Sequence, residues 1–102
     1  MKAVLKYQLP RFAPGVRFPV MLPADARFLA VQRRSVENSE VLNLWVLGTP
    51  DASRHVFENF FWLTTGHEVE DEFLEGMNYL GTVQLERGGV RIGYHLWGEV
   101  SR

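Results

Sequence analysis

The chain has 102 residues, of which 46% are hydrophobic and 13% aromatic, and its formal net charge is −1. A chain of this length suits one domain rather than two, so residues 1–102 are expected to form a single domain. The absence of cysteine excludes disulfides and thiolate metal sites. The lack of a basic excess argues against nucleic acid as a partner.

The apolar stretches of the chain are short, which argues against membrane insertion and secretion. No stretch approaches the ~20 residues that a membrane-spanning helix requires. Lys6 interrupts the apolar residues at the start, which leaves no apolar region of signal-peptide length. We therefore expect a cytoplasmic protein with no membrane partner.

Seven apolar-rich runs, each closed by Gly, Pro, Asn, Asp or Ser, predict seven β-strands. They span residues 2–9, 16–21, 27–34, 41–47, 54–64, 79–86 and 90–97. Pro19 lies within the second run and has no N–H to donate, so this strand is expected at a sheet edge or a bulge. The fourth run is almost entirely apolar, which is typical of a central strand covered on both faces.

The fifth run contains an aromatic triplet, Phe60-Phe61-Trp62, that breaks the alternation of apolar and polar residues. Either a bulge near Asn59 or burial of both strand faces would explain it. Arg87-Gly88-Gly89 predicts a tight turn, so the last two runs form a clearly marked hairpin. Together the runs predict an all-β fold, either a seven-stranded antiparallel sandwich or a partly open barrel.

The segment 65–78 is the least strand-like part of the sequence. Five carboxylates lie between Glu68 and Glu75, and Gly76 could stop a short helix near residues 68–76. We interpret the carboxylates as a solvated acidic face, because acid–base catalysis needs a pocket that shifts one pKa.

Three apolar residues, Phe28, Val46 and Trp97, have no evident cover within one copy of this fold. A homo-oligomer, in its simplest form a two-fold dimer, would bury them. We therefore expect the protein to self-associate.

One polar cluster could form a ligand site. Thr65 and His67 flank Gly66 at the end of the fifth predicted strand, where a sharp turn would let them donate to an anion or a ribose. An ordinary strand-ending turn explains the same residues, and edge-strand charges explain the arginines. The last hairpin adds further polar groups, and arginine suits phosphate. The candidate ligand-binding residues are Thr65, His67, Gln84, Arg91, His95 and Arg54.

The same sequence gives little support for catalysis. His55, His67 and His95 lie in different segments without the spacing of metal ligands, so no metal site is expected. No serine stands in a Gly-x-Ser-x-Gly elbow, and no Gly-x-x-x-x-Gly-Lys phosphate loop occurs. We expect a protein that is not an enzyme and carries no cofactor.

Several short segments follow one another along the chain in a characteristic order and spacing. They are Thr65-Gly66-His67, Tyr79-Leu80-Gly81-Thr82-Val83-Gln84 and His95-Leu96-Trp97, together with residues 2–7, 21–26, 29–32 and 44–47. Their succession resembles a family of small bacteriophage and prophage proteins. The segment Glu58-Asn59-Phe60-Phe61 departs from the family's pattern, as does Gly98-Glu99. The resemblance carries over no catalytic residue.

The resemblance implies a phage-type accessory protein that acts inside the host cell, and two functions follow from it. In the first, the protein sequesters a small anionic ligand or nucleotide, such as an immune signal, and so inhibits host defence. In the second, it is an interaction or structural module that binds a host or phage protein. The first is preferred if the polar groups of the last hairpin converge with Thr65-Gly66-His67 on one face.

Overall fold

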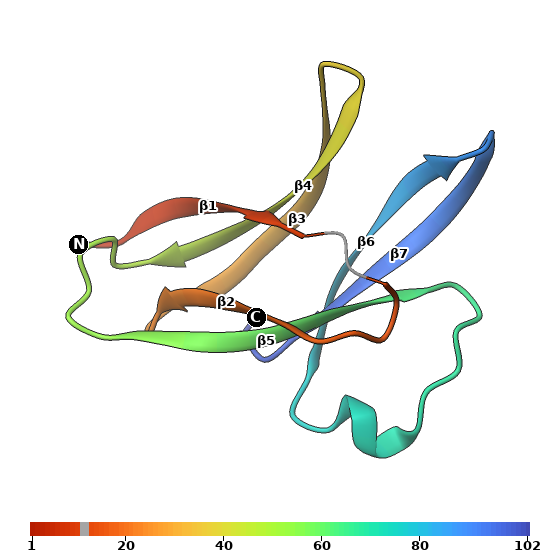
Figure 1. Ribbon diagram of the computed structural model, residues 1–102. Helices are drawn as coiled ribbons and strands as arrows, with labels where there is room; N and C mark the ends of the chain where they lie inside the picture. Colours follow the sequence, from red (N-terminus) through yellow and green to blue (C-terminus); the bar gives the residue numbers. More distant parts are fainter. Residues whose placement is uncertain (11–12) are drawn as a thin grey trace.

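The computed structural model describes residues 1–10 and 13–102 (Figure 1). The predicted strands are confirmed, with ends that differ by two residues at most, and a single turn of 3-10 helix lies within the acidic segment. The described residues contain no helix that is long and apolar enough to cross a membrane. The elements are β1 (Ala3–Leu9), β2 (Phe18–Pro23), β3 (Arg27–Val36), β4 (Ser39–Gly48), β5 (His55–Thr64), η1 (Asp71–Leu74), β6 (Asn78–Arg87) and β7 (Val90–Gly98).

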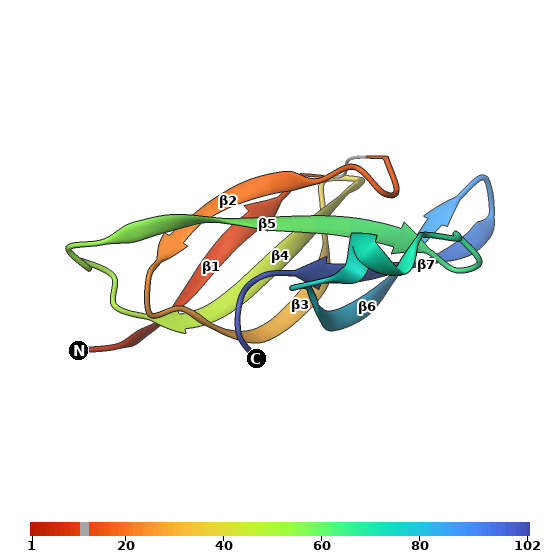
Figure 2. The same ribbon diagram turned by 90° about the horizontal axis from the view of Figure 1, so that it is seen from below.

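The strands form two antiparallel sheets that lie face to face (Figure 2). Sheet A has the strand order β1-β4-β3, and sheet B has the order β2-β5-β7-β6. The sheets do not close into a barrel, so of the two predicted architectures the open sandwich is the observed one. The strand that contains Pro19 lies at an edge of sheet B, as its missing N–H donor predicted.

The core lies between the two sheets, because alternate side chains of each strand point to opposite faces. In β4, Leu44 and Val46 are fully buried, whereas Trp45 between them is half-buried on the outer face of sheet A. In β7, Tyr94 and Leu96 belong to the same core. Each fully buried side chain of this size stabilises the fold by roughly 1.5–3 kcal/mol.

A second apolar cluster covers the outer face of sheet B, which is the face turned away from sheet A. Phe61 and Leu63 are buried there with Met77, because the segment after β5 folds back over them. Phe73 of η1 packs against Phe61, with ring centroids 4.5 Å apart. The pairing of β5 with both of its neighbours runs without a register shift, so burial of both faces explains the aromatic triplet.

The premise that Phe28, Val46 and Trp97 lack cover in a single copy is wrong. Val46 is fully buried in the core, and Phe28 packs against that core from β3. Trp97 packs in the second cluster and stacks at 6.4 Å from the Phe61 ring. These residues therefore give no support to a dimer, which stays a prediction.

Candidate functional site

A pocket of about 300 Å³ lies on the outer face of sheet B, where β5 ends. We call it the site pocket. It brings together three candidate residues from the sequence analysis, Thr65, His67 and His95. The lining residues are Leu63, Thr64, Thr65, Gly66, His67, Tyr79, His95 and Trp97.

His95 stands in the middle of this face, because β7 runs between β5 and β6. The residues on either side of it in β7 point into the core, so the alternation turns its imidazole outward. Nε2 lies 2.8 Å from Thr65 Oγ1, and Nδ1 lies 2.7 Å from Thr82 Oγ1. Hydroxyls from both sides therefore hold the two ring nitrogens and fix the orientation of the ring.

A β-bulge adds Tyr79 to the same network. The pairing of β6 with β7 shifts register between Tyr79 and Gly81, so Leu80 and Gly81 both face the interior. Tyr79 and Thr82 can then share the outer face although they are three positions apart, and their hydroxyls are hydrogen-bonded. We call Thr65, His95, Thr82 and Tyr79 the hydroxyl–imidazole chain.

Two aromatic rings form one wall of the site pocket. The rings of Tyr79 and Trp97 meet edge to face, with centroids 5.6 Å apart. The Phe61 ring lies parallel to the Trp97 ring and supports it. The wall is therefore held by the second apolar cluster and offers a surface for a planar group.

Gly93 leaves the room that the Thr65–His95 contact needs. A Cβ at this position would lie 2.9 Å from Thr65 Oγ1 and 3.6 Å from His95 Nε2. The Gly93 backbone also contacts Thr65 directly, because the Thr65 N–H donates to the Gly93 carbonyl at 3.2 Å. A glycine in the middle of β7 thus lets the end of β5 close over the imidazole.

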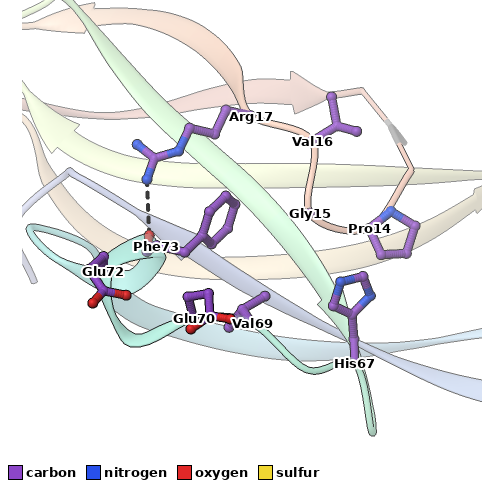
Figure 3. Close-up of a pocket in the computed structure, with 9 residues that line it drawn as sticks. All are labelled: Pro14, Gly15, Val16, Arg17, His67, Val69, Glu70, Glu72 and Phe73. Carbon is purple, nitrogen blue, oxygen red and sulfur yellow. Dashed lines mark hydrogen bonds between the residues drawn. The ribbon is translucent and has the colours of Figure 1, made fainter.

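His67 lies at the border between the site pocket and a larger concavity of about 740 Å³ (Figure 3). The His67 ring turns toward Gly15, where an added Cβ would lie 3.5 Å from Nε2. In the larger concavity, Arg17 donates to the Phe73 carbonyl at 2.9 Å, and its guanidinium lies 4.9 Å from the Phe73 ring centroid. Arg17 therefore helps to hold η1 against sheet B.

The other three candidate residues do not line the site pocket. Gln84 and Arg91 lie on the same outer face nearer the tip of the β6–β7 hairpin, where Arg91 donates to Gln84 Oε1 at 3.5 Å. Arg54 lies before the start of β5, in a different pocket that Asp25 and Asp51 also line. The structure thus brings only part of the candidate ligand-binding residues together in the site pocket, and it places Arg54 elsewhere.

Sequence reasoning missed Tyr79 as a member of the site. With strict alternation Tyr79 and Thr82 would face opposite sides of the strand, and only the bulge at Leu80 brings them together. The neighbouring Gly81 was the one available signal, because a glycine within a strand often marks a bulge.

The family model described as Domain of unknown function (DUF7352) matches residues 1–102. The chain belongs to this family. No curated protein and no solved structure matches this DUF7352 chain. Membership of DUF7352 assigns no activity, so the chemistry of the site pocket carries the functional argument, and the resemblance to phage proteins stays a prediction.

Proposed function

We propose that this DUF7352 protein is a non-enzymatic binding protein that holds a small anionic ligand, such as a nucleotide, in the site pocket. The observation that carries the proposal is His95, whose two ring nitrogens are held by Thr65 and Thr82 at the floor of a pocket walled by aromatic rings. A functional side chain that is held by its neighbours is suited to recognition, because little ordering is needed when a ligand arrives.

The polar groups of the site pocket favour a negatively charged ligand. Its lining contains hydroxyls, imidazoles and a glycine backbone, and no carboxylate stands among the described residues that form it. Hydroxyl and imidazole groups can donate hydrogen bonds to an oxyanion, and the Trp97 ring can stack on a base. Gln84 and Arg91 lie farther along the same face, where they could contact a longer ligand.

The biological form of this proposal is sequestration. A phage-type accessory protein in the host cytoplasm would lower the free concentration of its ligand, for example a nucleotide immune signal, without converting it. This part of the proposal is supported by the sequence resemblance alone, and the ligand class is supported by the site pocket.

Native mass spectrometry of the protein after incubation with a nucleotide extract of bacterial cells tests the proposal. We expect a mass shift of the intact protein and a raised midpoint of thermal unfolding with the same compound. A ligand at 100 times its Kd adds about 2.7 kcal/mol to the free energy of unfolding.

Two variants separate the site pocket from other surfaces. His95→Ala removes the central imidazole and should abolish the mass shift. Arg54→Ala, in a pocket that shares no residue with the site pocket, should retain it. Equal loss of binding in both variants, or no mass shift with any nucleotide, contradicts the proposal.

A second candidate function is an interaction or assembly module, and one exposed pair favours it. Met21 and Phe57 are paired across β2 and β5, with exposed fractions of 49% and 65%. Exposed apolar side chains on neighbouring strands often mark a contact with another protein or a second copy. Light scattering should then show a dimer that Phe57→Glu dissociates, whereas Val90→Glu at the tip of the β6–β7 hairpin should not dissociate it. A monomeric wild-type protein that captures no partner contradicts this candidate.

A further inference from the structure

The hydroxyl–imidazole chain has one more proton than it can use internally. With a neutral imidazole, the four groups Thr65, His95, Thr82 and Tyr79 each carry one polar proton. Three hydrogen bonds join them in sequence, and each bond uses one proton. One proton is therefore left over, and it lies on Thr65, Thr82 or Tyr79, because the Thr82 hydroxyl can also accept from both of its neighbours.

Two of these arrangements place the left-over proton at an end of the chain, and they differ in the His95 tautomer. If Thr65 donates outward, Nε2–H donates to Thr65, Thr82 donates to Nδ1, and Tyr79 donates to Thr82. If Tyr79 donates outward, all three internal bonds reverse and His95 carries its proton on Nδ1. Thr65 and Tyr79, the two ends, both line the site pocket. The hydrogen bonds that a ligand can make there therefore depend on the direction of the three internal bonds.

The Thr65 end is the better place for an oxyanion. Gly66, which is next to it, is exposed, and its backbone N–H has no hydrogen-bond partner among the described residues. A Cβ added at Gly66 would meet no atom within 4 Å, so a ligand can approach the backbone closely. His67 also lines this end. The Tyr79 end, by contrast, lies against the Trp97 ring.

We infer that the site pocket selects an oxyanion that also carries an N–H or O–H donor directed at Tyr79. This inference rests on the proposed function. An oxyanion that accepts a hydrogen bond from Thr65 uses the left-over proton in that bond. His95 is then the Nε2–H tautomer, Thr82 donates to Nδ1, and Tyr79 donates to Thr82. The Tyr79 oxygen can then only accept, and the part of the ligand that reaches it must donate.

The inference defines a ligand class by proton balance. Nucleoside phosphates belong to the class, since they combine an oxyanion with ring, amino or ribose donors. Ligands that only accept are disfavoured, because accepting at both ends would require one further proton on His95 or the loss of one internal hydrogen bond. Thr65 and Thr82 hydrogen-bond the His95 ring, Leu63 is its pairing partner in β5, and Tyr79 joins through Thr82. None of these residues is a carboxylate, and no carboxylate is among the described residues that line the site pocket.

A matched pair of probes tests the inference: 4-hydroxybenzenesulfonate and 4-methoxybenzenesulfonate. Both carry the same sulfonate and an aromatic ring, but only the first can donate to Tyr79. We expect the hydroxyl compound to bind about threefold to tenfold more tightly, as one hydrogen bond allows. In Tyr79→Phe, which removes the acceptor from a partly exposed position, the two probes should bind equally.

Nitrogen-15 NMR of the His95 ring supplies a second readout on the wild-type protein. With the hydroxyl probe bound, His95 should be the Nε2–H tautomer. Equal affinity of the two probes for the wild-type protein, or an Nδ1–H tautomer in the complex, overturns the inference while the site pocket still binds anions. Binding of neither probe also overturns the inference, whereas the nucleotide mass shift decides the proposed function separately.

Discussion

Thr65 Oγ1 lies 2.8 Å from His95 Nε2, although the two residues are 30 positions apart in the chain. The contact exists because β5 and β7 are antiparallel neighbours, so the end of β5 reaches the middle of β7. It turns a strand-ending threonine and an ordinary strand histidine into parts of one polar site.

Replacing Thr65 by valine should weaken ligand binding and leave the fold intact. Valine keeps the shape of threonine and removes the hydroxyl, so His95 Nε2 loses its partner. We expect about a tenfold loss of affinity and a change below ~1 kcal/mol in the free energy of unfolding, since Thr65 is exposed. Ligand titration and urea unfolding measure the two effects. Thr65→Ser should restore binding, and a serine variant as weak as the valine variant would contradict the role of the hydroxyl.

Gly93→Ala should lower affinity by displacing the Thr65 side chain. The new methyl group would meet Thr65 Oγ1 at 2.9 Å and push it away from His95. In a Thr65→Ala background that obstacle is gone, so the same substitution should have little further effect on binding. A double-mutant cycle of ligand affinities measures this coupling. Additive losses would show that Gly93 acts without Thr65.

Gly98→Ala should destabilise the core. A Cβ at this buried position would lie 2.4 Å from Phe60 Cδ2 and 2.9 Å from Leu80 Cδ1. Because Phe60 is fully buried and has little room to move, we expect a loss of about 1–3 kcal/mol in urea unfolding. Gly48→Ala is the matched control, since its nearest contact would be an ordinary 3.4 Å to Pro23 Cγ. A Gly98→Ala protein as stable as this control would mean that the Phe60 and Leu80 side chains move aside at no cost.

Protonation of the Asp25 carboxylate should make the fold less stable in acid. Hydrogen bonds from the Thr49 hydroxyl and backbone N–H, at 2.7 and 3.1 Å, hold the pKa of the Asp25 carboxyl below its usual range, and Lys2 adds a smaller effect. The stabilisation is fully present above the unfolded-state pKa of about 3.9 and is lost as pH falls through the lower, folded-state pKa.

Urea unfolding of wild type and Asp25→Asn between pH 7 and pH 3 measures this effect. We expect the variant to be less stable at pH 7 and the difference to shrink as the pH approaches 3. Asp51→Asn, which changes an exposed carboxylate that lines the same pocket as Asp25, serves as the control. A gap between wild type and Asp25→Asn that stays constant with pH would assign the effect to something other than the Asp25 charge.

Local patterns were sufficient to predict the strands. Alternation in β1 and β7, Pro19 in β2 and the turn at Gly88-Gly89 are properties of short segments, and the structure agrees with them. The Phe60-Phe61-Trp62 triplet left two explanations open, because a local pattern does not reveal what covers the second face. The packing of Phe73 on Phe61 settles this in favour of burial on both faces.

The site was only partly predictable. Thr65, His67 and His95 could be named because their residue types and neighbouring turn suggest ligand contacts, and they line one pocket. Arg54 was grouped with them by residue type, yet it lies beside another pocket. Tyr79 was missed because its place depends on a bulge.

The sequence by itself determined where strands form, because the two-residue period of side chains and the turn residues act over short distances. Only the tertiary structure decided that β7 lies between β5 and β6, that the segment after β5 covers sheet B, and that a register shift turns Tyr79 toward His95. These features depend on contacts between distant segments, whose free energies arise from packing of whole faces rather than from any local pattern.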